Sequence, residues 1–144
     1  MLVIGDYSAE AGDFPGTDRL SMAAHQPVLE LLQTKPASIV LFEGDRLFCA
    51  DFLTEVQSID GAQLKIVMIE ASGPTLKARH TQRGDTQSGV FLKGRKTKVL
   101  SVVNDPRLRS RVVCLQNNTP EDAARALAML RVWVGITGAR VPRP

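Results

Sequence analysis

The sequence has few of the residues that build metal clusters and catalytic relays. It contains two cysteines, Cys49 and Cys114, and two histidines, His25 and His80. The cysteines lack the spacing of zinc ligands, and neither histidine has a recognisable carboxylate or cysteine partner. The pattern therefore indicates no zinc cluster and no histidine-based nucleophile. Both thiols are interpreted as small core residues.

Long apolar runs are also lacking. No stretch approaches the roughly 20 residues of a membrane-spanning helix, and the N-terminus has no basic region followed by a hydrophobic segment. We therefore expect a cytoplasmic protein that does not contact a membrane. A chain of 144 residues with 44% hydrophobic content suits one compact domain, expected over residues 1–134, with 135–144 as a flexible C-terminal tail.

Charge is divided unevenly along the chain. Residues 1–70 hold four basic and eleven acidic side chains, whereas the remaining 74 residues hold fourteen basic and four acidic ones. The basic half is suited to binding anions. A solvated helical surface is the alternative interpretation of such a charged segment.

Apolar periodicity predicts alternating strands and helices. Strands are expected at 2–4, 38–43, 64–69 and 111–115, and helices at about 27–32, 47–56, 72–83, 90–103 and from Thr119 onward. The third strand is nearly continuous in apolar residues, as in a strand covered on both faces. The last helix is expected to turn one apolar side toward the sheet: Ala124, Leu127, Leu130, Val132 and Val134. This order predicts an α/β fold in which helices flank a parallel sheet.

The second strand ends abruptly in Glu43, Gly44, Asp45 and Arg46. Ligands of parallel α/β sheets bind at the carboxyl ends of the strands. The pattern therefore makes Glu43 a candidate to face a metal ion or a phosphate. Farther along, the polar segment 84–89 has a glycine at each end and no periodic apolar positions, which indicates a mobile loop that could act as a lid.

This order of elements resembles the P-loop nucleotide and nucleoside kinases. Three segments, GTDRLSM (16–22), EGDR (43–46) and FLKGRKTK (91–98), are similar to phage-type kinases that phosphorylate hydroxymethylated bases in DNA. The resemblance covers residues 2–134. It implies a P-loop kinase-like fold with a phosphotransferase activity that uses ATP and Mg²⁺.

One element of that superfamily is missing from the sequence. The first strand and its Walker A loop, G-x-x-x-x-G-K-[ST], have no counterpart. The nearest string, 89–97, has one residue too many before its lysine and lies in an expected helix. We therefore expect a fragment, a start-site truncation, or a kinase-like domain that has lost ATP binding. A partner segment or chain could supply the missing strand.

The resemblance implies a role for each candidate residue. Glu43 would help to hold Mg²⁺ through water, and Asp6 would orient or deprotonate the acceptor hydroxyl. The acceptor, a nucleotide or a base in DNA, would be bound by Asp18, Arg19 and Arg46. The lid that closes over ATP would carry Arg79, Arg83 and Arg95, and Lys98 would contact a phosphate.

Structural alternatives remain open for each of these residues. Glu43 and Arg46 could pair with each other, Asp6 and Asp18 could serve turns, and each lid arginine could be solvated. A noncatalytic module that binds nucleotide or nucleic acid through a basic, lid-like face is the alternative function. The sequence contains one tryptophan and one tyrosine. This low number argues against a protein that binds single-stranded nucleic acid by stacking bases on aromatic side chains.

Overall fold

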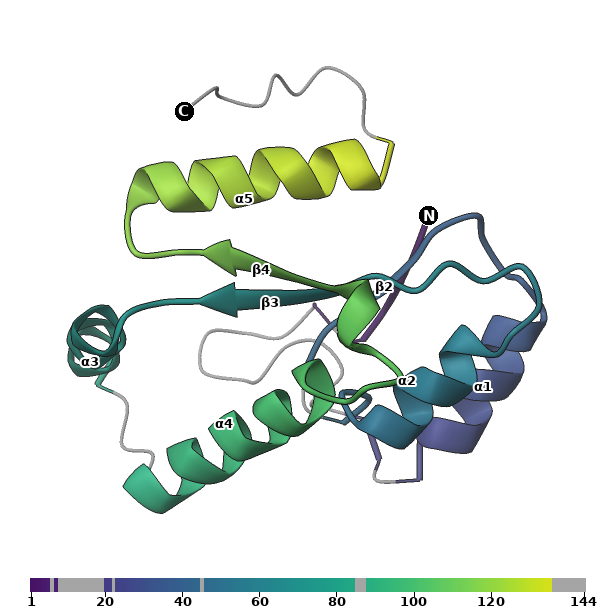
Figure 1. The fold of residues 1–144 in the computed structure, drawn as a ribbon, viewed down its shortest axis with the longest axis horizontal. Helices are drawn as coiled ribbons and strands as arrows, with labels where there is room; N and C mark the ends of the chain where they lie inside the picture. Colours follow the sequence, from purple (N-terminus) through teal and green to yellow (C-terminus); the bar gives the residue numbers. More distant parts are fainter. Residues whose placement is uncertain (6, 8–19, 22, 45, 85–87, 136–144) are drawn as a thin grey trace. The chain divides into compact units, whose positions relative to one another are not determined.

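The chain forms two compact units, each with its own parallel strand pair (Figure 1). The structure is a computed structural model that describes residues 1–5, 7, 20–21, 23–44, 46–84 and 88–135. Unit 1 comprises Met1–Lys65 and Gly89–Arg111, and unit 2 comprises Ile66–Ser88 and Val112–Pro144. An α/β architecture with parallel strands is confirmed. A single domain over 1–134 and a kinase-like fold stay predictions.

Unit 1 is built on the parallel pair β1 (Leu2–Ile4) and β2 (Val40–Phe42), with Val3 opposite Leu41. Its helices are α1 (His25–Gln33), α2 (Ala50–Gln57), α4 (Gly89–Val103) and the 3-10 helix η2 (Arg109–Arg111). Helices α1 and α2 pack against each other. The strands and helices of unit 1 thus lie where the sequence predicts them, although β2 is shorter than 38–43.

A well-filled core holds unit 1 together. Eleven of its described apolar residues are buried, among them Leu47, Leu53, Val102 and Leu108. Phe52 is 1% exposed, and its ring lies 5.0 Å from the His25 ring and 6.0 Å, edge-on, from the Phe42 ring. Burying a phenylalanine contributes about 1.5–3 kcal/mol, so this cluster stabilises the strand pair and both helices.

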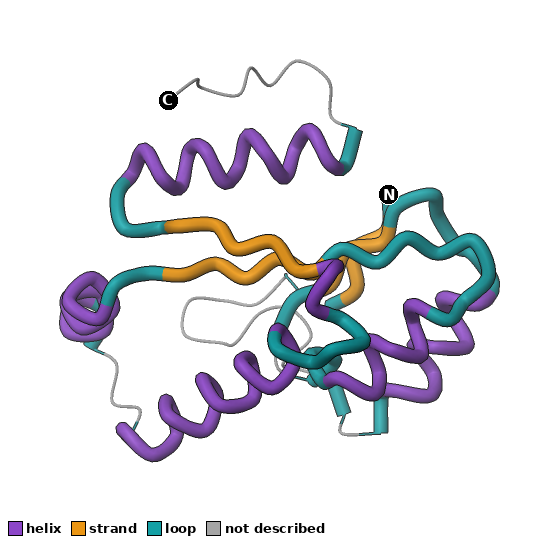
Figure 2. The backbone as a smooth tube through the Cα atoms, viewed as in Figure 1, coloured by secondary structure: helices purple, strands orange, loops and turns teal. Residues whose placement is uncertain are grey.

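Unit 2 is built on the parallel pair β3 (Ile66–Glu70) and β4 (Val112–Gln116). The two strands are parallel and lie side by side (Figure 2). Each strand is followed by a helix, α3 (Gly73–Gln82) after β3 and α5 (Pro120–Trp133) after β4. Ser72 caps α3 by accepting a hydrogen bond from the Thr75 amide, so the predicted helix start is confirmed.

The core of unit 2 is small. Its buried apolar residues, within the described part of the chain, are Ile66, Leu115, Ala126 and Ala128. Helix α3 buries no residue, and Ile69 is 55% exposed. The prediction that this strand is covered on both faces is therefore wrong at Ile69, because more than half of that residue stays exposed to solvent.

The predicted inner side of α5 is wrong at three of its five residues, whereas Leu130 and Val134 are half-buried. Helix α5 packs against β4, but Leu127 and Val132 are 49% and 52% exposed and Ala124 is exposed. Ala126 and Ala128 are buried instead. Alanines occur on several sides of this helix and can be buried or exposed, so the apolar pattern did not fix its rotation.

Candidate functional site

Glu43 lies where the sequence placed it, directly after the carboxyl end of β2. Its side chain is exposed. The next residue, Gly44, has a φ of 106°, which a residue with a Cβ rarely adopts. The chain can therefore turn sharply at this point, and the carboxylate stays at the carboxyl edge of the β1–β2 pair.

Tyr7 is the residue at this edge that the sequence analysis missed. It follows β1, and its hydroxyl donates a long hydrogen bond of 3.5 Å to Glu43 Oε1. Partial burial and the neighbouring Glu43 carboxylate raise the pKa of Tyr7 above its usual value. Tyr7 and Glu43 are 36 positions apart, and only the parallel pairing of β1 with β2 brings them together.

Arg46 belongs to the same loop as Glu43. Its side chain is exposed, and its carbonyl oxygen lies 2.7 Å from His25 Nε2. A carbonyl can only accept a hydrogen bond, so this nitrogen of His25 donates. The Cys49 sulfur lies 4.0 Å from the same nitrogen. His25 thus anchors the loop to the start of α1.

Three acceptor-side candidates, Asp6, Asp18 and Arg19, lie outside the described residues. So does the segment 16–22 except for Leu20 and Ser21, and three residues of the expected lid loop, 85–87. Their predicted roles stay predictions.

The lid arginines of α3 belong to unit 2. Arg79 Nη2 donates to Asn117 Oδ1 at 3.5 Å, which connects α3 to the residue after β4. Arg83 Nε donates to the Arg79 carbonyl at 3.4 Å, so its guanidinium folds back along the end of its own helix. Arg79 is therefore directed to the carboxyl end of the β3–β4 pair.

The basic residues of α4 belong to unit 1. Arg95 and Lys98 are partly exposed, and Lys93 and Lys96 are exposed. Helix α4 contains no acidic residue, and neither does α3. The candidates Glu43, Arg46, Arg95 and Lys98 are thus in unit 1, and Arg79 and Arg83 are in unit 2.

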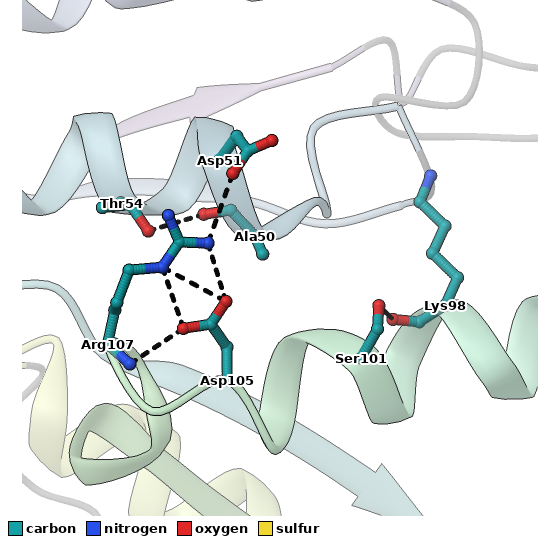
Figure 3. A network of polar contacts seen from close by, with 7 residues as sticks. All are labelled: Ala50, Asp51, Thr54, Lys98, Ser101, Asp105 and Arg107. Atoms are coloured by element: carbon teal, nitrogen blue, oxygen red, sulfur yellow. Dashed lines mark hydrogen bonds and ion pairs between the residues drawn. The ribbon is translucent and has the colours of Figure 1, made fainter.

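Arg107, by contrast, is held by carboxylates (Figure 3). Its guanidinium donates to Asp105 Oδ2 at 2.7 Å and to Asp51 Oδ1 at 3.2 Å. The Arg107 side chain and backbone amide hold the pKa of Asp105 at about 2. In Figure 3, Lys98 extends away from this network, and its carbonyl accepts from the Ser101 hydroxyl at 2.7 Å. Arg107 therefore connects the end of α4 to α2 and is no candidate for ligand binding.

A second polar edge lies at the carboxyl end of the β3–β4 pair. Glu70 and Gln116 are in register there, and Gln116 Nε2 donates to Glu70 Oε2 at 3.3 Å. Asn118 Oδ1 accepts from the Ser72 amide at 2.7 Å, and Asp122 accepts from the Asn118 amide at 2.9 Å. Asn117 and Asn118 were expected only to turn the chain. Asn118 also joins the starts of α3 and α5, whereas the Asn117 side chain contacts Arg79 in the last turn of α3.

The described residues contain no cluster of three or more histidine, cysteine or acidic side chains able to hold a metal ion. None of their helices is both long enough and apolar enough to cross a membrane. A scan against protein-family models found no match, and searches of curated proteins and of solved structures found no significant relative. The two strand edges and the basic helices are therefore the features that bear on the function.

Proposed function

We propose that this chain is the acceptor- and lid-bearing part of a phosphotransferase that uses ATP and Mg²⁺ and acts on a nucleotide or a modified base in nucleic acid. One observation carries the proposal. Glu43 is an exposed carboxylate at the carboxyl end of the parallel pair β1–β2, where parallel α/β folds bind their ligands.

In phosphoryl transfer the protein need not form covalent bonds to the substrate. Phosphoryl transfer depends on positioning and on neutralising charge that is spread over the transferred group. Mg²⁺ is commonly held by one or two carboxylates together with waters and substrate phosphates, so Glu43 alone can serve, through water. Arg46, in the loop that follows β2, is suited to the acceptor, and the cations of α3 and α4 are suited to phosphate.

A phosphate-cradling loop has to come from elsewhere. No G-x-x-x-x-G-K-[ST] string occurs in the sequence, and such a loop follows a strand. The proposal therefore includes a partner segment or chain that brings both the strand and the loop.

The test is isothermal titration of the purified chain with Mg·ATP, beside Glu43→Gln. The variant keeps the shape of the side chain but removes its charge, so we expect Mg²⁺-dependent ATP affinity to fall about tenfold or more. Glu55→Gln, at an exposed glutamate of α2, is the matched control and should bind as the wild type does. Equal binding by Glu43→Gln would remove Glu43 from the proposal. No binding of Mg·ATP by the wild type would show that the residues of this chain bind no nucleotide without the partner's loop, and the comparison of Glu43→Gln with Glu55→Gln would then be made with the segment that carries the loop present.

A noncatalytic module that binds nucleotide or nucleic acid is the second candidate. It is favoured by the absence of acidic residues from α3 and α4. If these helices bind phosphates, the affinity for a short DNA duplex should fall steeply with salt. Arg95→Ala and Lys98→Ala should each reduce the salt slope by about 1, whereas Arg131→Ala in α5 should not change it. An unchanged slope in all three variants would indicate a solvated basic surface.

A further inference from the structure

We propose that one face of helix α4 docks into the major groove of a DNA duplex. This outer face consists of Val90, Gly94, Thr97 and Ser101. The inference deepens the second candidate function, on which it rests for the binding of nucleic acid. It adds which face of the helix meets the nucleic acid, which form of nucleic acid fits, and which groove receives the helix.

Burial identifies the outer face of α4. Val102 and Val103 are buried on the inner side, whereas all four outer-face residues are exposed, Val90 to 83%. The four residues are spaced three and four positions apart, which places them on one side of a helix. At 1.5 Å per residue the face is about 17 Å long. The helix therefore presents a continuous side to solvent.

The side chains of the outer face are short. Among the described residues, no atom apart from those of the neighbouring helix turns lies within 4 Å of the place where a Cβ of Gly94 would be. A glycine inside a helix costs about 1 kcal/mol relative to alanine, and a partner that approaches the helix backbone closely would explain it. The Thr97 and Ser101 hydroxyls donate to the carbonyls of Lys93 and Lys98 at 3.0 Å and 2.7 Å. These short side chains therefore fold back onto the helix.

Cations flank the outer face on both sides. Lys93 and Lys98 lie about 140° apart around the helix axis, with the outer face between them. Lys93 is exposed, Lys98 is partly exposed, and α4 contains no acidic residue. The partner should therefore be an anion that contacts both sides of the helix. The major groove of a DNA duplex is such a partner, because the phosphates of two strands border it.

The dimensions of the helix fit this groove. The major groove of B-form DNA is about 12 Å wide, and a helix with its side chains is about 10–12 Å across. The short side chains let the backbone of α4 approach the base edges, where the methyl group of Thr97 can contact a thymine methyl group. An RNA duplex does not fit, because the major groove of A-form helices is deep and narrow.

Other partners fit the outer face less well. Single-stranded nucleic acid is usually bound by stacking its bases on aromatic rings, and none of the four residues is aromatic. A membrane surface or an apolar helix needs a larger hydrophobic face, whereas Val90 is the only large hydrophobic residue of the four. Charge and shape together therefore favour duplex DNA.

The test is fluorescence anisotropy of a short labelled DNA duplex, titrated with the full chain at low salt and without ATP. We expect Gly94→Leu to weaken binding about tenfold or more, because its side chain fills the outer face, while the thermal midpoint stays equal or rises because leucine favours a helix. Gly89→Leu is the matched control and should bind within about twofold of the wild type. Gly89 is exposed in the same helix and also has open space at its Cβ position, but it lies off the outer face. If Gly94→Leu loses its far-UV circular dichroism, Thr97→Leu takes its place.

An RNA duplex and a single DNA strand of the same sequence should each bind about fivefold or more weakly than the DNA duplex. Equal affinity for either of them, or duplex binding that Gly94→Leu leaves unchanged, would overturn groove docking but leave phosphate binding by the basic helices in place. Binding to vesicles of anionic lipid without binding to DNA would assign the face to a membrane surface and overturn the proposal. No duplex binding by the wild type would overturn both this inference and the second candidate function. The phosphotransferase proposal, which is tested at Glu43 with Mg·ATP, would stand or fall separately.

Discussion

Single residues act in this protein mainly by joining segments that are distant in sequence. Arg107 does so with charge, because it binds Asp105 in its own loop and Asp51, 56 positions away in α2. Exposed ion pairs normally contribute little. Arg107 differs because one guanidinium holds two carboxylates and one of them, Asp105, also accepts from a backbone amide.

This network should make stability depend on pH. The folded-state pKa of Asp105 is about 2, below the 3.8 of an unperturbed aspartate, so the carboxylate stabilises the fold above about pH 4 and loses that effect as the pH falls toward 2. We expect Asp105→Asn to lower the thermal midpoint at pH 7 by a few degrees and to differ little from the wild type at pH 2. Thermal scans at pH 7, 4 and 2 measure this.

Asp60→Asn is the control for that series. Asp60 pairs with Lys35 at 3.5 Å, but its side chain is fully exposed, so its loss should shift the midpoint little at any pH. A deficit of Asp105→Asn that is the same at pH 7 and pH 2 would contradict the role of the Asp105 charge.

The position of a single residue could be predicted from the sequence where it depends on the residues next to it in the chain. Glu43 follows an apolar strand, and its position at the strand end was predicted; the structure adds that it is exposed. Tyr7 was missed because it follows a three-residue strand and its hydrogen bond reaches Glu43 across the sheet. The sequence showed no spacing that would join them.

Among the elements, helix starts were predicted best because capping residues lie within a few positions of the helix. At α5, the Thr119 hydroxyl accepts from the Asp122 amide and the Asp122 carboxylate accepts from the Thr119 amide, with Pro120 in the first turn. Such a reciprocal pair satisfies amides that the helix itself leaves unbonded. The rotation of α5 was predicted wrongly, because rotation depends on packing against β4 rather than on neighbours in sequence.

Loss of the α5 cap should destabilise unit 2. We expect Thr119→Ala to lower the free energy of unfolding by about 1 kcal/mol, whereas Thr119→Ser keeps the hydroxyl and should cost only a few tenths. Urea unfolding followed by fluorescence of Trp133, the only tryptophan in the sequence, reports on the end of α5. Equal losses in the two variants would mean that the methyl group of Thr119, not its hydroxyl, matters.

For the whole molecule, the sequence predicted the order of strands and helices but not the division into two units. Apolar periodicity shows which residues prefer to be buried. It does not show how far each side chain is buried in the folded protein. Unit 1 buries large side chains such as Phe52 and Leu47, whereas unit 2 leaves Ile69 and Leu127 half exposed. This difference in core size between the two units depends on which strands pair, and the sequence pattern does not show that.

The two units should therefore differ in local stability. We expect the amides of β3 and β4 to exchange with solvent at least tenfold faster than those in the middle of α1 and α2, because fewer apolar groups resist opening in unit 2. Native-state hydrogen exchange read by mass spectrometry measures both in one sample. Equal protection in the two units would show that the small core of unit 2 is sufficient by itself.

The interleaving of the two units along the chain also has a consequence for biosynthesis. Unit 1 needs Val102 and Leu108, so it remains incomplete when its first 65 residues leave the ribosome. Strand β3 emerges next but waits more than forty residues for β4. At the roughly 5–20 residues per second of translation, β3 spends some seconds without its partner strand, and an apolar unpaired strand is a target for chaperones and a starting point for aggregation.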